Sequence, residues 1–290
     1  MIDSGVTTGN YPELGAIVGH NYCDSSSGEV DYDGHGTATA GIAAGAAGNG
    51  VGMAGVSYAS PIMEIKVFGP ANSSGAPCTT YDPTYGPTDS ILSAAIYYAV
   101  ANGAGVINCS WGGFYADADV PLLKAAVDYA WSKNVPVVAS SGNENLSNFS
   151  DIVPARWSHV IAVGATDENN YRPDPSEWGY GNGSNYGTPG LDISAPGNNI
   201  LSTAIAPPVA YVTNLQGTSY AAPFVTGVVG LMLRRYPSLT SLQVKQRIWA
   251  SGQKVGGYSY TWNYLGFTCG GKGQSSELGC GLIDAYAAIR

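Results

Sequence analysis

The stretch NLQGTSYAAPFVTG, residues 214–227, places one serine, Ser219, behind a Gly-Thr pair and ahead of an apolar run that ends near Arg234 and Arg235. Two interpretations are open. Ser and Thr are favoured at helix N-termini, where a side-chain oxygen accepts a free backbone N–H, so Ser219 can simply open a helix. It can also be a nucleophile at the positive end of that helix. The remainder of the chain has to decide between the two.

The composition is that of a globular protein with an acidic surface. The chain has 290 residues, 44% of them apolar, and a formal net charge of -9. It can hold one large α/β domain or two smaller ones. Only 12 residues are Lys or Arg and none form a run, which argues against a nucleic-acid partner. No apolar segment reaches the roughly 18 residues that span a bilayer, so no membrane partner is expected.

Short apolar segments alternate with helical patterns along the chain. The expected strands, each bounded by Gly, Pro or Asn, are residues 62–68, 106–109, 135–140, 160–165 and 191–195. Residues suited to begin helices occur at three places between or after them: Thr88 with Asp89, Asp119 with Pro121, and Thr240 with Gln243. The last pair has capping-box spacing. Strands alternating with helices of this length predict right-handed crossovers and a mostly parallel sheet.

Two further residues lie where an open parallel sheet collects its chemistry, beyond the carboxyl ends of strands. Asp3 follows an apolar pair, and His35 lies in DGHGTATAGIAAG, residues 33–45, ahead of a helix of small residues. Alone, Asp3 fits an Asx-type turn and His35 a hydrogen-bonded core histidine. Together with Ser219 they supply a carboxylate, an imidazole and a hydroxyl. These are the parts of an activated serine nucleophile.

A family resemblance gives this combination its meaning. The blocks DSG, HGT and GTSYAAP, which contain Asp3, His35 and Ser219, resemble in that order the three signature blocks of the subtilisin-like serine proteases, or subtilases. The segments VINCSWGG, PVVASSGNEN, HVIAVGAT, LDISAPG and GCGLIDAYAA are similar to segments between and after them. The resemblance implies a subtilisin-like α/β fold, with a mostly parallel central sheet flanked by helices. It also implies a serine endopeptidase that works through an acyl-enzyme.

The resemblance assigns each residue a role. Ser219 is expected to be the nucleophile, His35 the general base and acid, and Asp3 the orienting carboxylate. Asn143, in SSGNEN, is expected to donate to the oxyanion together with the backbone N–H of Ser219. The expected helix beginning at Ser219 favours that oxyanion through its dipole. Pro223 is tolerated because the carbonyl that it leaves unpaired lies near the helix start.

Two segments are expected to bind protein or peptide substrates as an added strand. By the same resemblance they are Ser110, Trp111, Gly112 and Gly113, followed by Ala139, Ser140, Ser141 and Gly142. Because these walls are small and uncharged, they predict a broad preference for apolar or aromatic residues before the scissile bond. Trp111 can instead be a buried core aromatic.

A structural calcium ion is a further expectation, and no cofactor is expected for catalysis. The stretch AGNGVGMAG, residues 47–55, resembles a calcium-binding loop of many subtilases. Its candidate ligands are Asn49, the carboxylate of Glu13, and the carbonyls of Ala47, Val51 and Met53. Oxygen ligands suit calcium. A Gly-Asn-Gly turn also forms without a metal, so both alternatives stay open.

The five cysteines are not spaced like a zinc site. In a secreted or extracellular enzyme, which the resemblance implies although the opening residues MIDSGV form no signal peptide, Cys269 and Cys280 are expected to form a disulfide bond around a Gly-rich loop. Cys109, on an expected core strand, should stay a buried thiol. A bridge between Cys23 and Cys78 is left open.

The start of the chain carries one more expectation. Parallel strands usually run about five to six residues, yet only Met1 and Ile2 precede Asp3. We therefore expect residues 1–290 to form one peptidase domain that lacks its N-terminal segment, with a propeptide encoded upstream as a further option. The alternative function is a truncated subtilase-fold fragment with little or no activity, because Asp3 on a frayed strand would not orient His35.

Overall fold

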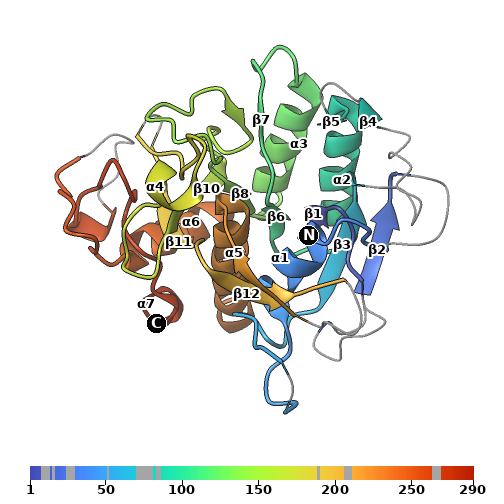
Figure 1. The fold of residues 1–290 in the computed structure, drawn as a ribbon. Coiled ribbons are helices and arrows are strands. Elements are labelled where there is room, and N and C mark those ends of the chain that lie inside the picture. Colours follow the sequence, from blue (N-terminus) through green and yellow to red (C-terminus); the bar gives the residue numbers. More distant parts are fainter. Residues whose placement is uncertain are drawn as a thin grey trace.

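The fold is seen in a computed structural model. It describes residues 1–7, 14, 17–23, 30–50, 52–69, 81–82, 86–187, 190–205, 211–262 and 269–290. Two parallel sheets form its centre (Figure 1). The first has the order β1-β3-β2, with β1 at Ile2–Asp3, β2 at Ile17–Asn21 and β3 at Ile62–Lys66. The second has the order β11-β10-β8-β6, with β6 at Ile107–Cys109, β8 at Val137–Ser140, β10 at Val160–Thr166 and β11 at Ile193–Pro196. Strand β1 contacts β6, so the two sheets lie side by side.

Helices cover both faces of the second sheet. The longer ones are α1 (His35–Ala44), α2 (Asp89–Ala101), α3 (Pro121–Ser132), α5 (Thr218–Arg235) and α6 (Ser241–Ser251). Short helical segments are α4 (Pro175–Trp178), η1 (Cys269–Gly271) and α7 (Ala285–Ile289). Successive residues of β8 enter different cores: Val137 and Ala139 pack with α2 and α3, and Val138 packs with α5 and α6. This alternation follows from strand geometry and explains why the strands are apolar throughout.

All five expected strands are present, each with shifted bounds, and the parallel α/β fold class is confirmed. Sequence reasoning missed β2, whose segment IVGHN contains a glycine and a histidine that weaken its strand pattern. It also missed three antiparallel pairs of strands. These are β12 (Ile200–Thr203) with β13 (Tyr211–Leu215), β4 (Tyr81–Asp82) with β5 (Gly86–Pro87), and β7 (Gly113–Phe114) with β9 (Ile152–Val153).

The expected helix starts have mixed outcomes. Thr240 and Gln243 form the expected capping box on α6. Helix α2 begins at Asp89 behind Thr88, as expected, but neither side chain caps it. The Asp89 carboxylate accepts from the backbone N–H groups of Leu122 and Leu123, so it caps α3. Helix α3 begins at Pro121, as expected, but Asp119 does not cap it, because its carboxylate accepts from the N–H of Ala116. Long-range packing of α3 against α2 therefore decides which carboxylate serves which helix.

Helix α1 fits against β1 because it consists mainly of small residues, and nine of its ten residues are buried. A Cβ atom added at Gly36 would overlap the carbonyl oxygen of Gly5 and press on the side chain of Asp3. Glycine at this position therefore lets the first turn of α1 approach the end of β1. The helix begins at His35, so this close approach brings the imidazole beside Asp3.

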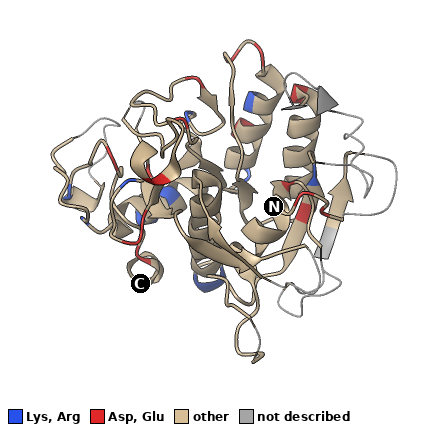
Figure 2. Cartoon of the chain, viewed as in Figure 1, with Lys and Arg blue, Asp and Glu red and all other residues tan. Residues whose placement is uncertain are grey.

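Charged residues are unevenly spread over the fold (Figure 2). Lys and Arg are scattered over several elements, and acidic residues gather near the N-terminal strand. Within the described part of the chain, no helix is both long and apolar enough to cross a membrane.

The cysteines follow the expectation where the structure describes them. Cys269 and Cys280 form a disulfide bond with a Cα–Cα distance of 5.5 Å. Cys109 is a free thiol buried in the core, and burial raises its pKa. Cys23 is disulfide-bonded. Cys78 lies outside the described residues, so the pairing of Cys23 with Cys78 stays open.

Opening the bridge is expected to destabilise the fold. Its cysteines are 11 residues apart, and closing a loop of this size contributes roughly 3 kcal/mol in the chain-entropy account. The variant Cys269→Ala/Cys280→Ala should lose about that much free energy of unfolding in urea titrations. Cys109→Ala, which keeps the bridge, should lose about 1 kcal/mol. Equal midpoints for the double variant and the wild type would contradict the expectation.

Candidate active site

Asp3 is a fully buried carboxylate at the end of β1. The strand has two residues and is nevertheless paired, with Ile2 opposite Ile65 and Asp3 opposite Lys66. The N–H of Ile65 donates to Met1 O at 2.8 Å and that of Val67 to Asp3 O at 2.9 Å. The backbone that carries Asp3 is thus held by a hydrogen-bonded ladder, and the expected fraying is not seen.

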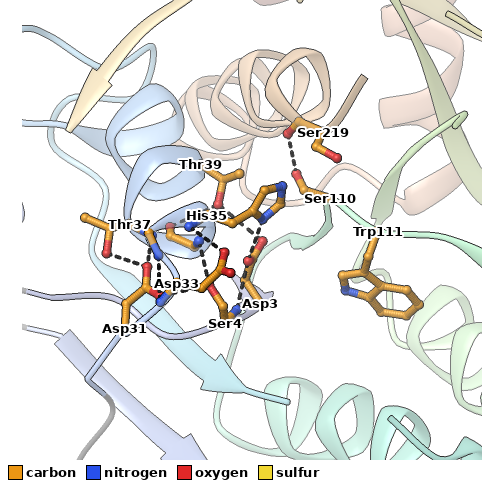
Figure 3. A network of polar contacts seen from close by, with 12 residues as sticks. Asp3, Ser4, Asp31, Asp33, His35, Thr37, Thr39, Ser110, Trp111 and Ser219 are labelled. Atoms are coloured by element: carbon orange, nitrogen blue, oxygen red, sulfur yellow. Dashed lines mark hydrogen bonds and ion pairs between the residues drawn. The ribbon is translucent and has the colours of Figure 1, made fainter. Parts of the chain in front are cut away.

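His35 opens α1 and faces this carboxylate (Figure 3). Its Nδ1 lies 2.7 Å from Asp3 Oδ1, the same oxygen that accepts from Ser4 N at 2.8 Å. The Thr39 hydroxyl lies 3.4 Å from Asp3 Oδ2 and 3.0 Å from Gly36 O, so these two acceptors compete for its single proton. Because an ionised carboxylate only accepts, Nδ1 carries the proton and Nε2 is free to accept one. The arrangement fixes the tautomer that a general base requires.

The charges around His35 set its proton affinity. Burial of the imidazole disfavours its charged form, but the Asp3 carboxylate, through charge and hydrogen bond, outweighs burial and raises the pKa of His35, with Asp33 and Asp31 contributing. The ring of Tyr220 lies 5.5 Å from the imidazole. Burial, followed by the charges of Asp3 and Asp33, raises the pKa of Tyr220 to about 12, so this neighbour is neutral at working pH.

Ser219 lies in the first turn of α5, which begins at Thr218, one residue earlier than expected. The residue before the helix, Gly217, has φ 147° and ψ 152°, a backbone conformation that side chains disfavour. The turn therefore depends on glycine. In Figure 3 the His35 imidazole lies between the carboxylate of Asp3 and the start of α5, where Ser219 is drawn.

The carbonyl of Ser219 has an unusual partner. Pro223 has no N–H, so Ser219 O has no hydrogen bond from the residue four positions on. Ser110 Oγ donates to it at 2.7 Å. Asn108 Nδ2 in turn donates to Ser110 Oγ at 2.8 Å, and Asn108 Oδ1 accepts from Thr226 of α5 at 2.8 Å. The end of β6 thus supplies the bond that the proline removes from α5.

Asn143 follows β8, and its amide orientation is fixed. Oδ1 accepts from Thr218 N at 2.8 Å and from Thr218 Oγ1 at 2.9 Å. The Thr218 hydroxyl also accepts from Gly142 N at 3.1 Å. With Oδ1 occupied, Nδ2 stays available as a donor beside the first turn of α5. Sequence reasoning did not assign a role to Thr218. The sequence signal was its place directly before Ser219, behind a glycine.

The expected substrate segments are only partly accessible. Ala139, Ser140 and Ser141 are buried, and Gly142 is half-buried. In the other segment Ser110 is buried and Gly112 is exposed. At the end of β8 the side chains of residues 139–141 therefore lie in the core, and the chain reaches the surface only from Gly142 onward.

Trp111 is both a core aromatic and part of the lining of a cavity, the two alternatives that the sequence left open. Its indole Nε1 donates to Ile2 O at 2.8 Å, and its ring packs on the core. The same ring lines a cavity of about 550 Å³, and Figure 3 shows it directed away from Ser219. The other lining residues are mainly apolar, among them Phe68, Leu92, Phe114, Tyr115, Val120 and Leu123, and the lining also contains the acidic residues Asp89 and Asp119.

The calcium expectation stays a prediction. Glu13 and Val51 lie outside the described residues. Asn49 is exposed between two glycines with positive φ, Gly48 at 76° and Gly50 at 78°. These angles account for the turn without a metal. In the described part of the chain, no group of three or more His, Cys, Asp or Glu residues could hold a metal ion. Within the described residues, the oxygen ligands that this loop offers are backbone carbonyls and the Asn49 amide, and the expected role of Glu13 stays a prediction.

Comparison with known proteins gives the arrangement its family. A family model described as the subtilase family matches residues 13–270. The chain belongs to this family of subtilisin-like serine proteases. M-protease of Shouchella clausii (strain KSM-K16) is 33% identical over 290 residues, which are 100% of this chain and 63% of that protein. Subtilisin BL of Lederbergia lenta is 33% identical over 100% of this chain and 89% of its own length.

A solved structure is also similar to this subtilase. Fervidolysin from Fervidobacterium pennivorans, described as a keratinolytic enzyme related to subtilisin, matches with a TM-score of 0.72 and 28% identity. The match covers 99% of this chain and 41% of fervidolysin. The subtilisin-like fold expected from the sequence is therefore confirmed.

The hydrogen bond from Ser110 can be tested through Pro223. Ser110→Ala leaves Ser219 O without its donor, which should cost about 1–3 kcal/mol of the free energy of unfolding. In a Pro223→Ala background the new N–H can bond Ser219 O, so the same substitution should cost less. Urea unfolding of the two single variants and the double variant measures this coupling. Strictly additive losses would show that the serine and the proline act independently.

Proposed function

We propose that this subtilase is a serine endopeptidase that hydrolyses peptide bonds through the triad Asp3, His35 and Ser219. The observation that carries the proposal is the 2.7 Å contact between His35 Nδ1 and the fully buried Asp3 carboxylate. A histidine held in this way, beside the first turn of a helix that bears a serine, has the groups that activate a hydroxyl.

The mechanism follows from these groups. Ser219 Oγ attacks the substrate carbonyl while His35 Nε2 takes its proton, and the Asp3 charge stabilises the imidazolium that forms. The imidazolium then protonates the leaving amine, which leaves an acyl group on Ser219. A water molecule, activated by the same imidazole, releases it. Among unbound enzymes the contact from nucleophile to base is often long and shortens with substrate.

Two donors are proposed for the oxyanion. One is the backbone N–H of Ser219, which the helix start leaves without an intrahelical acceptor. The other is Asn143 Nδ2, because both hydrogen bonds from Thr218 go to the opposite atom of that amide, Oδ1. Donors fixed before the reaction stabilise the developing charge without reorganisation.

For substrates we propose proteins or peptides with apolar or aromatic side chains near the scissile bond. The uncharged residues 110–113 and 139–142 support this preference, as does the cavity beside Trp111, which is mainly apolar apart from Asp89 and Asp119. The acidic residue nearest in sequence to the expected substrate segment 139–142 is Glu144, directly after Asn143. Its Oε2 accepts from Asn185 Nδ2 at 2.6 Å, which holds the carboxylate against that amide.

The truncated, inactive fragment is not the favoured alternative. It required Asp3 on a displaced strand, whereas Asp3 is buried and paired with β3. Secretion or an extracellular location is proposed from the disulfide between Cys269 and Cys280, since such bonds persist in oxidising compartments. A propeptide encoded upstream stays part of this proposal.

The direct test uses a fluorophosphonate probe, which reacts with activated serines. The wild type should be labelled at Ser219, as read by peptide mapping, and Ser219→Ala should not react. Ser132→Ala removes an exposed serine of α3 and should react like the wild type. Labelling that persists in Ser219→Ala, or that is lost equally in Ser132→Ala, would refute the assignment of the nucleophile.

The raised pKa of His35 predicts the pH dependence. Neutral imidazole is the active form, so kcat/KM should rise with pH through a pKa above the ordinary value of 6.5. The sign for stability is opposite. The ionised pair with Asp3 contributes fully below pH 6.5 and is lost as pH rises through the raised pKa. Asp3→Asn should move the rising limb of the profile to lower pH. An unchanged limb in that variant would contradict the role of Asp3.

A further inference from the structure

Asp31 is a buried carboxylate that the triad does not use. It precedes α1 and is 2% exposed. Its Oδ1 accepts from Ser4 Oγ at 3.0 Å, Asp33 N at 2.9 Å and Gly34 N at 2.8 Å. Its Oδ2 accepts from Thr37 N at 2.9 Å and Thr37 Oγ1 at 2.7 Å. A carboxylate with this many donors is satisfied only in its ionised, acceptor-only form.

These donors belong to two separate parts of the chain (Figure 3). Ser4 directly follows Asp3, and Ser4 N donates to Asp3 Oδ1. Ser4 Oγ also accepts from Gly36 N at 2.9 Å, so one hydroxyl joins the end of β1 to the first turn of α1. The other three donor residues lie in that turn or in the loop before it. Asp31 therefore holds together the two segments that carry Asp3 and His35.

We propose that Asp31 is a positioning residue for the triad. Its ionised carboxylate fixes the loop before α1 against the end of β1 and so sets the hydrogen bond between His35 and Asp3. The inference rests on the proposed function. Asp31 contacts neither His35 nor Ser219 in the described hydrogen bonds, so its action passes through Ser4 and the backbone of the loop.

Asp31 also acts on His35 through its charge, and this effect can be measured apart from its effect on the position of the loop. The groups facing the His35 imidazole are the carboxylates of Asp3, Asp31 and Asp33 and the neutral phenol of Tyr220. Among the described residues, two cationic groups lie next to these segments: Lys66, whose Nζ donates to Ser4 O, and the N-terminal ammonium of Met1, which interacts with the charge of Asp3. Burial lowers the pKa of His35, and the three carboxylates raise it. Removing the charge of Asp31 should therefore lower this pKa as well as loosen the loop.

Three variants distinguish these effects. In Asp31→Asn an NH₂ group must face at least one of the donors now bound, so we expect kcat at the pH plateau to fall roughly tenfold to a hundredfold, with KM within about twofold. The rising limb should also move to lower pH. Ser4→Ala keeps the charge of Asp31 but removes the hydroxyl that joins β1 to α1. Its plateau kcat should therefore fall, while the rising limb of its pH profile stays in place. Asp33 Oδ1 accepts from His35 N at 3.2 Å, a bond that the amide oxygen of Asn can keep, so Asp33→Asn, at an exposed position, should move the limb and keep the plateau.

Kinetics are normalised to fluorophosphonate-titrated sites, and thermal unfolding reports folding. A plateau kcat in Asp31→Asn equal to that of Asp33→Asn would overturn the proposal. If Asp31→Asn does not fold, Ser4→Ala decides: a lowered plateau supports positioning, and a wild-type plateau refutes it. Failure of the wild type itself to react with the probe would instead refute the proposed function, so the two failures are distinguishable.

Discussion

The structure depends on one buried carboxylate. Asp3 is fully enclosed where β1 ends, so its oxygens need donors inside the protein. Ser4 N and the imidazole of His35 both donate to Oδ1, and the Thr39 hydroxyl lies 3.4 Å from Oδ2. This requirement brings α1 against β1, and the helix can approach because Gly36 has no side chain. The orientation of His35 thus follows from the need to satisfy a buried charge.

The opposite wall of the site is held in an equivalent way by β6, β8 and α5. Pro223 deprives the Ser219 carbonyl of its helical donor, and Ser110, at the end of β6, replaces it. Thr218 fixes the amide of Asn143 at the end of β8. In each case a side chain that follows a parallel strand bonds the first turn of α5. The ends of strands from the two sheets therefore position both the base and the serine, which is the advantage of building a site beyond strand ends.

The sequence was sufficient for features that are local or carried by family motifs. The parallel sheet, the capping box at Thr240 and the bridge between Cys269 and Cys280 were all predicted correctly. The roles of Asp89 and Asp31 were not predicted, because their partners are set by packing between segments far apart in the chain. The short strand before Asp3 could be predicted from the sequence, but its pairing with β3, which keeps Asp3 in place, could not. Secondary-structure propensity describes single segments of the chain, whereas these contacts join segments that are far apart in the sequence.

The most direct measurement is a crystal structure of the enzyme after reaction with a fluorophosphonate. The account predicts a phosphorus–oxygen bond to Ser219 Oγ, with the phosphonyl oxygen about 2.7–3.1 Å from both Ser219 N and Asn143 Nδ2. It also predicts that His35 Nδ1 keeps its contact with Asp3. An adduct on another residue, or a phosphonyl oxygen directed into solvent away from Asn143, would contradict it.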